Sequence, residues 1–253
     1  LNPNFELLVD DIIEKNQKHK LSEYINKWIH NKINNILKSL IDLKNLKEKN
    51  SSIKALAYQL YENNGVLKRE QVSEYLKKLG QDERKILREL GVKFGRYHVF
   101  LYQLIKPEAV SLRTLLWKNF HQKHYNLKPP TFGLNFLNDK ESKNKNFMLL
   151  CGFEKFDTFF IRIDILERLF MLIINSPDSK VNKEIKLIPE MLNLLGCSTE
   201  NFKKLLQKMG YKVFSKDDET FFRYSPIKKF KKTSIKKMTS ENPFKILKNL
   251  NLV

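Results

Sequence analysis

The chain of 253 residues is long enough for one large domain or two modest ones, and it is more charged than an average globular protein. Its formal net charge of +19 favours a polyanionic partner such as nucleic acid, although lysine, asparagine and isoleucine abound everywhere, as in proteins from AT-rich genomes. Two cysteines without metal-binding spacing argue against a disulfide framework or zinc site and favour a cytoplasmic setting. No apolar run has the length of a membrane-spanning helix, so we expect no membrane partner.

The first 122 residues are predicted to form a helical bundle. Apolar residues at steps of three and four follow Ser22, which we expect to cap a helix that runs to about Lys49. A second helix is expected to begin at Ser51 and to end at Gly65, because glycine readily takes the left-handed conformation that closes a helix.

The bundle is expected to continue with two short helices, over residues 69–79 and 82–90, and then to leave through a strand and a helix. Residues 92–105 are rich in β-branched and aromatic side chains, which is typical of a strand. Pro107 suits the first turn of a helix that we expect to run to residue 122.

Residues 123–146 are predicted to be a linker, because they are rich in proline, lysine, serine and asparagine. A second, smaller α+β unit is expected over residues 147–224. Its first elements are predicted to be strands at 147–151 and 158–163, joined by a turn, and then a helix that begins at Asp164.

The end of this unit has the element order of a winged helix. Residues 189–224 predict a helix, a tight turn at Gly196, a second helix and a hairpin. Residues 225–253 are predicted to be a basic tail with a short terminal helix. The expected fold class is therefore α+β, mainly α with small β elements: a helical bundle followed by a winged-helix-like C-terminal unit.

Motifs for catalysis are missing from the sequence. It has no GxxxxGK[ST] phosphate loop, no GxSxG elbow and no HExxH pair. His121 and His124 have helical spacing, but no acidic or sulfur ligand lies near them in the sequence. We therefore expect no catalytic residue, no metal site and no cofactor in this segment.

Three basic clusters are candidates for nucleic-acid binding. The first lies beside Gly95, where glycine would let a nucleic-acid backbone approach and aromatic rings would stack on bases; its members are Lys93, Arg96, Tyr97 and His98. The alternative is that Gly95 relieves a β-bulge and that the aromatic rings belong to the core.

The second cluster is one face of the second helix of the winged-helix pattern, opposite an apolar face; its members are Lys203, Lys204, Gln207 and Lys208. The third is in the tail and consists of Lys228, Lys229, Lys231 and Lys232, which would neutralise phosphates without reading sequence. The alternatives are a solvated face of a packing domain and a solubilising charge run.

Five blocks of the sequence resemble the region after the motor in alphaproteobacterial superfamily 2 helicases of the Suv3-like type. The blocks occur in the same order and at similar spacing: ALAYQLYENNGVL (55–67), LRELGVKFGRYHVFLYQLIKPEAVSLRTLLW (87–117), CGFEKFDTFFIRIDILERL (151–169), LLGCSTENFKKLLQKMGYK (194–212) and ENPFKILKNL (241–250). The long block at 87–117 is the most specific of them.

The resemblance implies an ATP-dependent RNA helicase whose two motor lobes precede this segment, so that the chain would be a C-terminal piece. ATP and Mg²⁺ would then be cofactors of the motor, and no ATPase residue is transferred to this chain. The implied role is to bind nucleic acid, most of all single-stranded RNA, and to complete the strand channel, with Lys93 and Arg96 facing the strand. Two alternatives remain: an independent winged-helix DNA-binding module and a protein-interaction scaffold.

Overall fold

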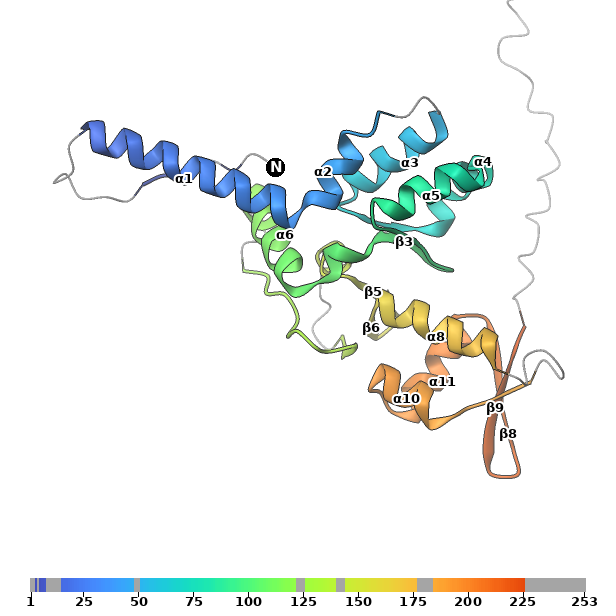
Figure 1. Ribbon diagram of the computed structural model, residues 1–253. Helices are drawn as coiled ribbons and strands as arrows, with labels where there is room; N and C mark the ends of the chain where they lie inside the picture. The colour runs from blue at the N-terminus through green and yellow to red at the C-terminus, as the bar shows by residue number, and fades with distance from the viewer. Residues whose placement is uncertain are drawn as a thin grey trace, which may run out of the picture.

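The structure is a computed structural model, and it describes residues 3, 5–7, 15–47, 51–121, 126–139, 144–176 and 184–225. Within these residues the fold is α+β, with helices around three small antiparallel sheets (Figure 1). The expected α+β class is therefore confirmed. Among the described helices, none combines the length and the apolar character that a membrane span requires.

The first part of the chain is helical, with a break that the sequence pattern did not reveal. The helices are α1 (Lys15–Ile36), α2 (Lys38–Lys44), α3 (Ser51–Glu62), α4 (Ser73–Lys78) and α5 (Gln81–Glu89). The prediction of one helix from Ser22 to Lys49 is wrong, because the chain leaves helical geometry at the fully buried Leu37. This break lets α2 turn onto α3, whereas α1 extends away from the bundle (Figure 1).

The first sheet has the order β1-β3-β2, and its central strand is buried on both faces. Its strands are β1 (Val66–Lys68), β2 (Val92–Phe94) and β3 (His98–Leu101). The predicted single strand over 92–105 is instead a hairpin followed by a 3-10 turn, Tyr102–Ile105, because the chain reverses at Gly95 and β2 pairs with β3. Helix α6 (Pro107–Phe120) follows, and its expected start at Pro107 is confirmed.

The second sheet has the order β4-β6-β5, with β4 (Phe136–Asn138), β5 (Phe153–Phe156) and β6 (Phe159–Arg162). Strand β4 lies inside the segment that we expected to be a linker. The predicted strand at 147–151 is wrong: these residues belong mostly to helix α7 (Lys145–Leu150). The side chain of Asn144 caps this helix by accepting a hydrogen bond from the Phe147 N–H at 3.0 Å, which favours a helix over a strand in a short apolar run.

The third sheet closes the C-terminal unit, with the order β7-β9-β8. The elements are α8 (Ile163–Asn175), β7 (Ile185–Lys186), α10 (Pro189–Leu195), α11 (Thr199–Lys208), β8 (Tyr211–Lys216) and β9 (Glu219–Tyr224). The two helices and the hairpin predicted over 189–224 are confirmed. Gly196 ends α10 at φ 67°, and Asp217 and Asp218 make the hairpin turn at φ 49° and 60°, so both turns follow from local residue chemistry.

Apolar contacts join the bundle to the C-terminal unit. Each has a core of its own, around Leu56 in the bundle and around Phe202 in the C-terminal unit. A smaller cluster connects them, in which Val66 of β1 and Phe100 of β3 pack with Ile163 at the start of α8. Helix α8 is therefore seated against the first sheet, and this contact positions the site described next.

Candidate nucleic-acid interface

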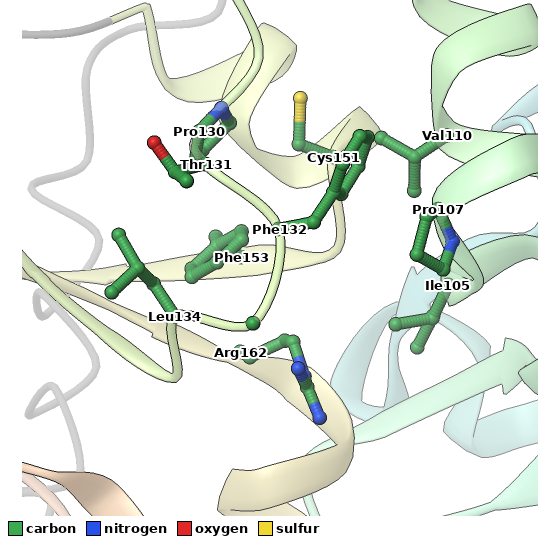
Figure 2. A pocket seen from close by; sticks show the side chains of 11 residues that line it. Ile105, Pro107, Val110, Pro130, Thr131, Phe132, Leu134, Cys151, Phe153 and Arg162 are labelled. Carbon is green, nitrogen blue, oxygen red and sulfur yellow. The ribbon is translucent and has the colours of Figure 1, made fainter.

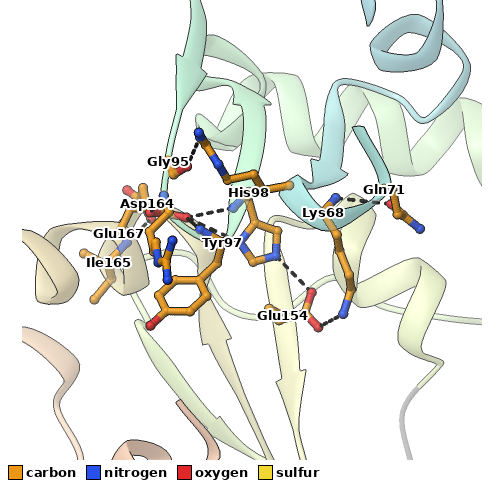
Figure 3. Close-up of polar contacts among 11 residues, drawn as sticks. Lys68, Gln71, Gly95, Tyr97, His98, Glu154, Asp164, Ile165 and Glu167 are labelled. Atoms are coloured by element: carbon orange, nitrogen blue, oxygen red, sulfur yellow. Dashed lines mark hydrogen bonds and ion pairs between the residues drawn. The ribbon is translucent and has the colours of Figure 1, made fainter. Parts of the chain in front are cut away.

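The tip of the β2–β3 hairpin is held against α8 by one carboxylate, Glu167 (Figure 3). The carboxylate accepts three consecutive backbone hydrogen bonds: from the N–H of Arg96 at 2.5 Å, of Tyr97 at 2.9 Å and of His98 at 2.9 Å. A Cβ atom at Gly95 would lie 2.3 Å from the Glu167 carboxyl carbon, so only glycine allows this approach.

His98 lies beneath this contact and is only 2% exposed. Its Nε2 is 3.1 Å from Glu154 of β5, and its Nδ1 is 3.6 Å from Glu167 of α8. Lys68 of β1 contacts the other oxygen of Glu154 at 2.5 Å. A chain of ionisable side chains, all but Lys68 largely buried, thus joins the first sheet to β5 and α8 (Figure 3).

These contacts change the pKa values of the buried groups. Burial alone would lower the pKa of His98, but its hydrogen bond to Glu154 and the negative charges of Glu154 and Glu167 raise it above its ordinary value of 6.5. Burial alone would raise the pKa of Glu154 and of Glu167, but their hydrogen bonds lower both below 4.5. Folding therefore favours the charged form of each group relative to the unfolded chain.

The free energy of unfolding should consequently be greatest between about pH 4.5 and 6.5. Stabilisation by His98 is complete below its unfolded pKa and is lost as the pH rises through its higher folded pKa. Stabilisation by the two glutamates is present above their unfolded pKa and is lost as the pH falls through their lower folded values. Urea unfolding should therefore give a lower free energy of unfolding at about pH 8.5 than at about pH 5.5.

His98→Gln should remove most of the decrease in the free energy of unfolding at high pH, because glutamine does not titrate. His30→Gln is the matched control, since His30 is exposed on α1 and its Nδ1 lies 2.8 Å from the backbone oxygen of Asn26. An equal pH dependence in wild type and His98→Gln would show that His98 does not couple folding to pH.

A groove of about 880 Å³ lies between the β2–β3 hairpin and α8, above the Glu167 contact. Five basic side chains line it: Arg69, Lys93, Arg96, Arg162 and Arg168. Four of these are arginines, half of the eight arginines in a chain whose other basic residues are lysines. Two carboxylates, Asp164 and Glu167, line it as well, so the groove carries an excess of positive charge.

The basic face predicted on α11 is present. Phe202, Leu205 and Leu206 are fully buried, whereas the opposite side of the helix is open to solvent. The predicted residues on that side are exposed Lys204, Gln207 and Lys208 and half-buried Lys203. Lys208 lies 3.6 Å from Asp157 in the β5–β6 turn, so one charge of this face is already partnered.

The two cysteines are free thiols, of which Cys151 is buried and Cys197 half-buried. Cys151 lines a small, largely apolar cavity of about 50 Å³ between α6 and the loop at 130–134, which has room for a few water molecules only (Figure 2). Burial raises the pKa of the Cys151 thiol to about 12 and that of Cys197 to about 11, so both stay protonated at neutral pH. Across the residues that the structure describes, no group of three or more His, Cys, Asp or Glu side chains is placed to hold a metal ion.

The structure divides the first predicted cluster. Lys93 and Arg96 are exposed at the groove. Tyr97 instead packs into the core of the C-terminal unit, with its ring 5.7 Å from that of Phe170, and burial raises the pKa of its hydroxyl group. His98 is buried between two carboxylates, so the expectation that Tyr97 and His98 stack on bases is not met in this conformation.

The tail residues Lys228, Lys229, Lys231 and Lys232 lie outside the described residues. Sequence reasoning missed four residues that line the groove: Arg69, Tyr102, Arg162 and Arg168. They come from four separate parts of the chain and have no common local pattern. The scarcity of arginine in a lysine-rich chain was the signal that could have indicated the arginines among them.

The chain matches no known protein-family model, and no curated protein and no solved structure is significantly similar to it.

Proposed function

We propose that the chain is an accessory, nucleic-acid-binding region of an ATP-dependent RNA helicase of the Suv3-like type. Its role would be to hold a single strand of RNA and to complete the strand channel, while motor lobes in the same polypeptide hydrolyse ATP with Mg²⁺. Because the chain has no phosphate loop, no nucleotide step is assigned to its residues.

The element order of residues 163–224 carries this proposal. Helix α8, strand β7, helices α10 and α11 and strands β8 and β9 follow one another, in a sheet of order β7-β9-β8. We interpret this unit as a winged helix, with α11 in the position of the recognition helix and Lys203 and Lys204 on its open face. Such helices bind nucleic acid without chemistry of their own.

A second observation supports the helicase assignment over an isolated DNA-binding module. Two of the blocks that resemble the helicases, 87–117 and 151–169, meet in space at the groove. Three backbone N–H groups of the first block bind Glu167 of the second, and His98 of the first binds Glu154 of the second. Two blocks of the resemblance thus meet at a physical junction between two parts of the chain.

The test is a binding titration with single-stranded RNA and with duplex DNA, at about 50 mM and about 200 mM salt, beside an ATP-hydrolysis assay. We expect tighter binding to single-stranded RNA, weaker at the higher salt, and no hydrolysis. Sequence-selective binding to duplex DNA would favour an independent winged-helix module instead. Weak RNA binding that vanishes at about 200 mM salt would favour an interaction scaffold, and ATP hydrolysis after stringent purification would refute the accessory role.

A further inference from the structure

We propose that the groove between the β2–β3 hairpin and α8 is the binding site for the single strand, with phosphates on Arg96, Arg168 and Lys93 and a base stacked on Tyr102. This inference rests on the proposed function, because it names where the strand lies. It also assigns a role to Arg168 and Tyr102, which no sequence motif singled out.

The free charge in the groove is positive, because both of its carboxylates are already satisfied. Asp164 forms a two-pronged contact with Arg162, with Nε–Oδ1 at 2.7 Å and Nη2–Oδ2 at 3.1 Å. Glu167 is occupied by the three backbone N–H groups of the hairpin tip. Lys93, Arg96 and Arg168 are exposed, and none has a carboxylate partner in the described part of the chain, so they are free to bind phosphates.

The apolar lining of the groove argues for exposed bases as the rest of the ligand. Tyr102 and Met171 both line the groove, and their side chains are 45% and 54% exposed. On α8, Arg168 and Met171 are three residues apart and so lie on one face, which places a cation beside an apolar surface. The guanidinium group of Arg96 lies 5.8 Å from the centre of the Phe170 ring and repeats this pairing.

A single strand fits this combination of cationic and apolar side chains better than a duplex does. The outer surface of a duplex is made of phosphates and sugars, and its bases are stacked inside, so a duplex would set phosphates against the apolar lining. A single strand can turn its bases onto Tyr102 while its phosphates reach the arginines. The groove therefore differs from the lysine face of α11, which is purely polar.

The test uses the whole chain and four variants: Arg168→Gln, Arg96→Gln combined with Arg168→Gln, Tyr102→Leu, and the control Lys54→Gln. Lys54 is an exposed residue of α3 in the bundle, and the Lys54→Gln substitution also removes one positive charge. The probes are labelled oligouridylate, oligodeoxythymidylate of the same length, a duplex DNA and a polyglutamate peptide. All substituted groove side chains are exposed, so circular dichroism should show unchanged folding.

We expect the double arginine variant to bind oligouridylate at least about tenfold more weakly than Lys54→Gln, with a salt slope shallower by about 0.7 for each lost phosphate contact. Tyr102→Leu should weaken binding about tenfold and leave the salt slope unchanged, because stacking releases no counterions. The same variants should also weaken the binding of oligodeoxythymidylate, since RNA and DNA strands both have phosphates and base faces.

The outcomes separate this inference from the proposed function. If wild type binds no nucleic acid, both are wrong. If wild type binds oligouridylate and the groove variants bind as Lys54→Gln does, the groove assignment is overturned and the proposed function remains. If polyglutamate displaces oligouridylate at equal charge and Tyr102→Leu has no effect, the groove takes an acidic peptide and not a nucleic-acid strand.

Discussion

Glu167→Ala is expected to lower the free energy of unfolding by about 3 kcal/mol. The substitution removes the acceptor of three backbone hydrogen bonds, and hydrogen bonds to a charged group contribute about 1.5–3 kcal/mol each. The N–H of Arg96 belongs to an exposed residue and can bind water instead, which limits the loss to the part-buried contacts at Tyr97 and His98. Urea unfolding measures the change.

Two further variants make this result specific. Glu89→Ala removes an exposed carboxylate at the end of α5 and should change stability by less than about 0.5 kcal/mol. Gly95→Ala should reproduce much of the Glu167→Ala loss, because the added Cβ would collide with the Glu167 carboxyl group. A Glu167→Ala protein as stable as Glu89→Ala would mean that the hairpin tip is not held by this carboxylate.

Arg113→Met is expected to lower the free energy of unfolding by about 2–3 kcal/mol. Arg113 of α6 is 3% exposed and has no carboxylate partner among the described residues. Its guanidinium group donates to the backbone oxygens of Asn64, at 2.6 Å, and of Leu104, at 2.5 Å. Methionine fills similar space but leaves both oxygens without a donor.

Burial of a charge opposes part of this stabilisation, because it lowers the pKa of Arg113 to about 10. The expected loss is therefore smaller than the sum of two charged hydrogen bonds. Arg88→Met on α5 is the control, since Arg88 is exposed and its guanidinium group lies 5.7 Å from the centre of the Phe94 ring. Thermal unfolding should separate the two variants, and equal midpoints would contradict the proposed role of the Arg113 contacts.

The parts of the fold that sequence predicted are those with a local cause. Pro107 begins α6, Gly196 ends α10, and the aspartates at 217 and 218 turn the last hairpin. Helix α7 was missed although its cap at Asn144 is local, but the other missed parts depend on distant contacts. Strands β4 and β7 are three and two residues long, and each is defined only by its pairing with a longer strand.

The same distinction applies to the site. Lys93 and Arg96 stood out because they flank Gly95 within four residues of sequence. The partners of His98 are Glu154, 56 residues further on, and Glu167, 69 residues further on, so the local sequence left base stacking and burial in the core both open for its ring. Arg168 lies on a helix whose sequence indicates only an amphipathic packing face, and only the fold brings it opposite the hairpin.

The salt dependence of binding to single-stranded RNA tests the central claim most directly. If Lys93, Arg96 and Arg168 each neutralise one phosphate, a plot of the logarithm of the association constant against the logarithm of salt concentration should be linear with a slope of about −2 or steeper. ATP hydrolysis should be absent in the same samples. A slope near zero, or no binding at about 50 mM salt, would contradict the account of this chain as a nucleic-acid-binding region.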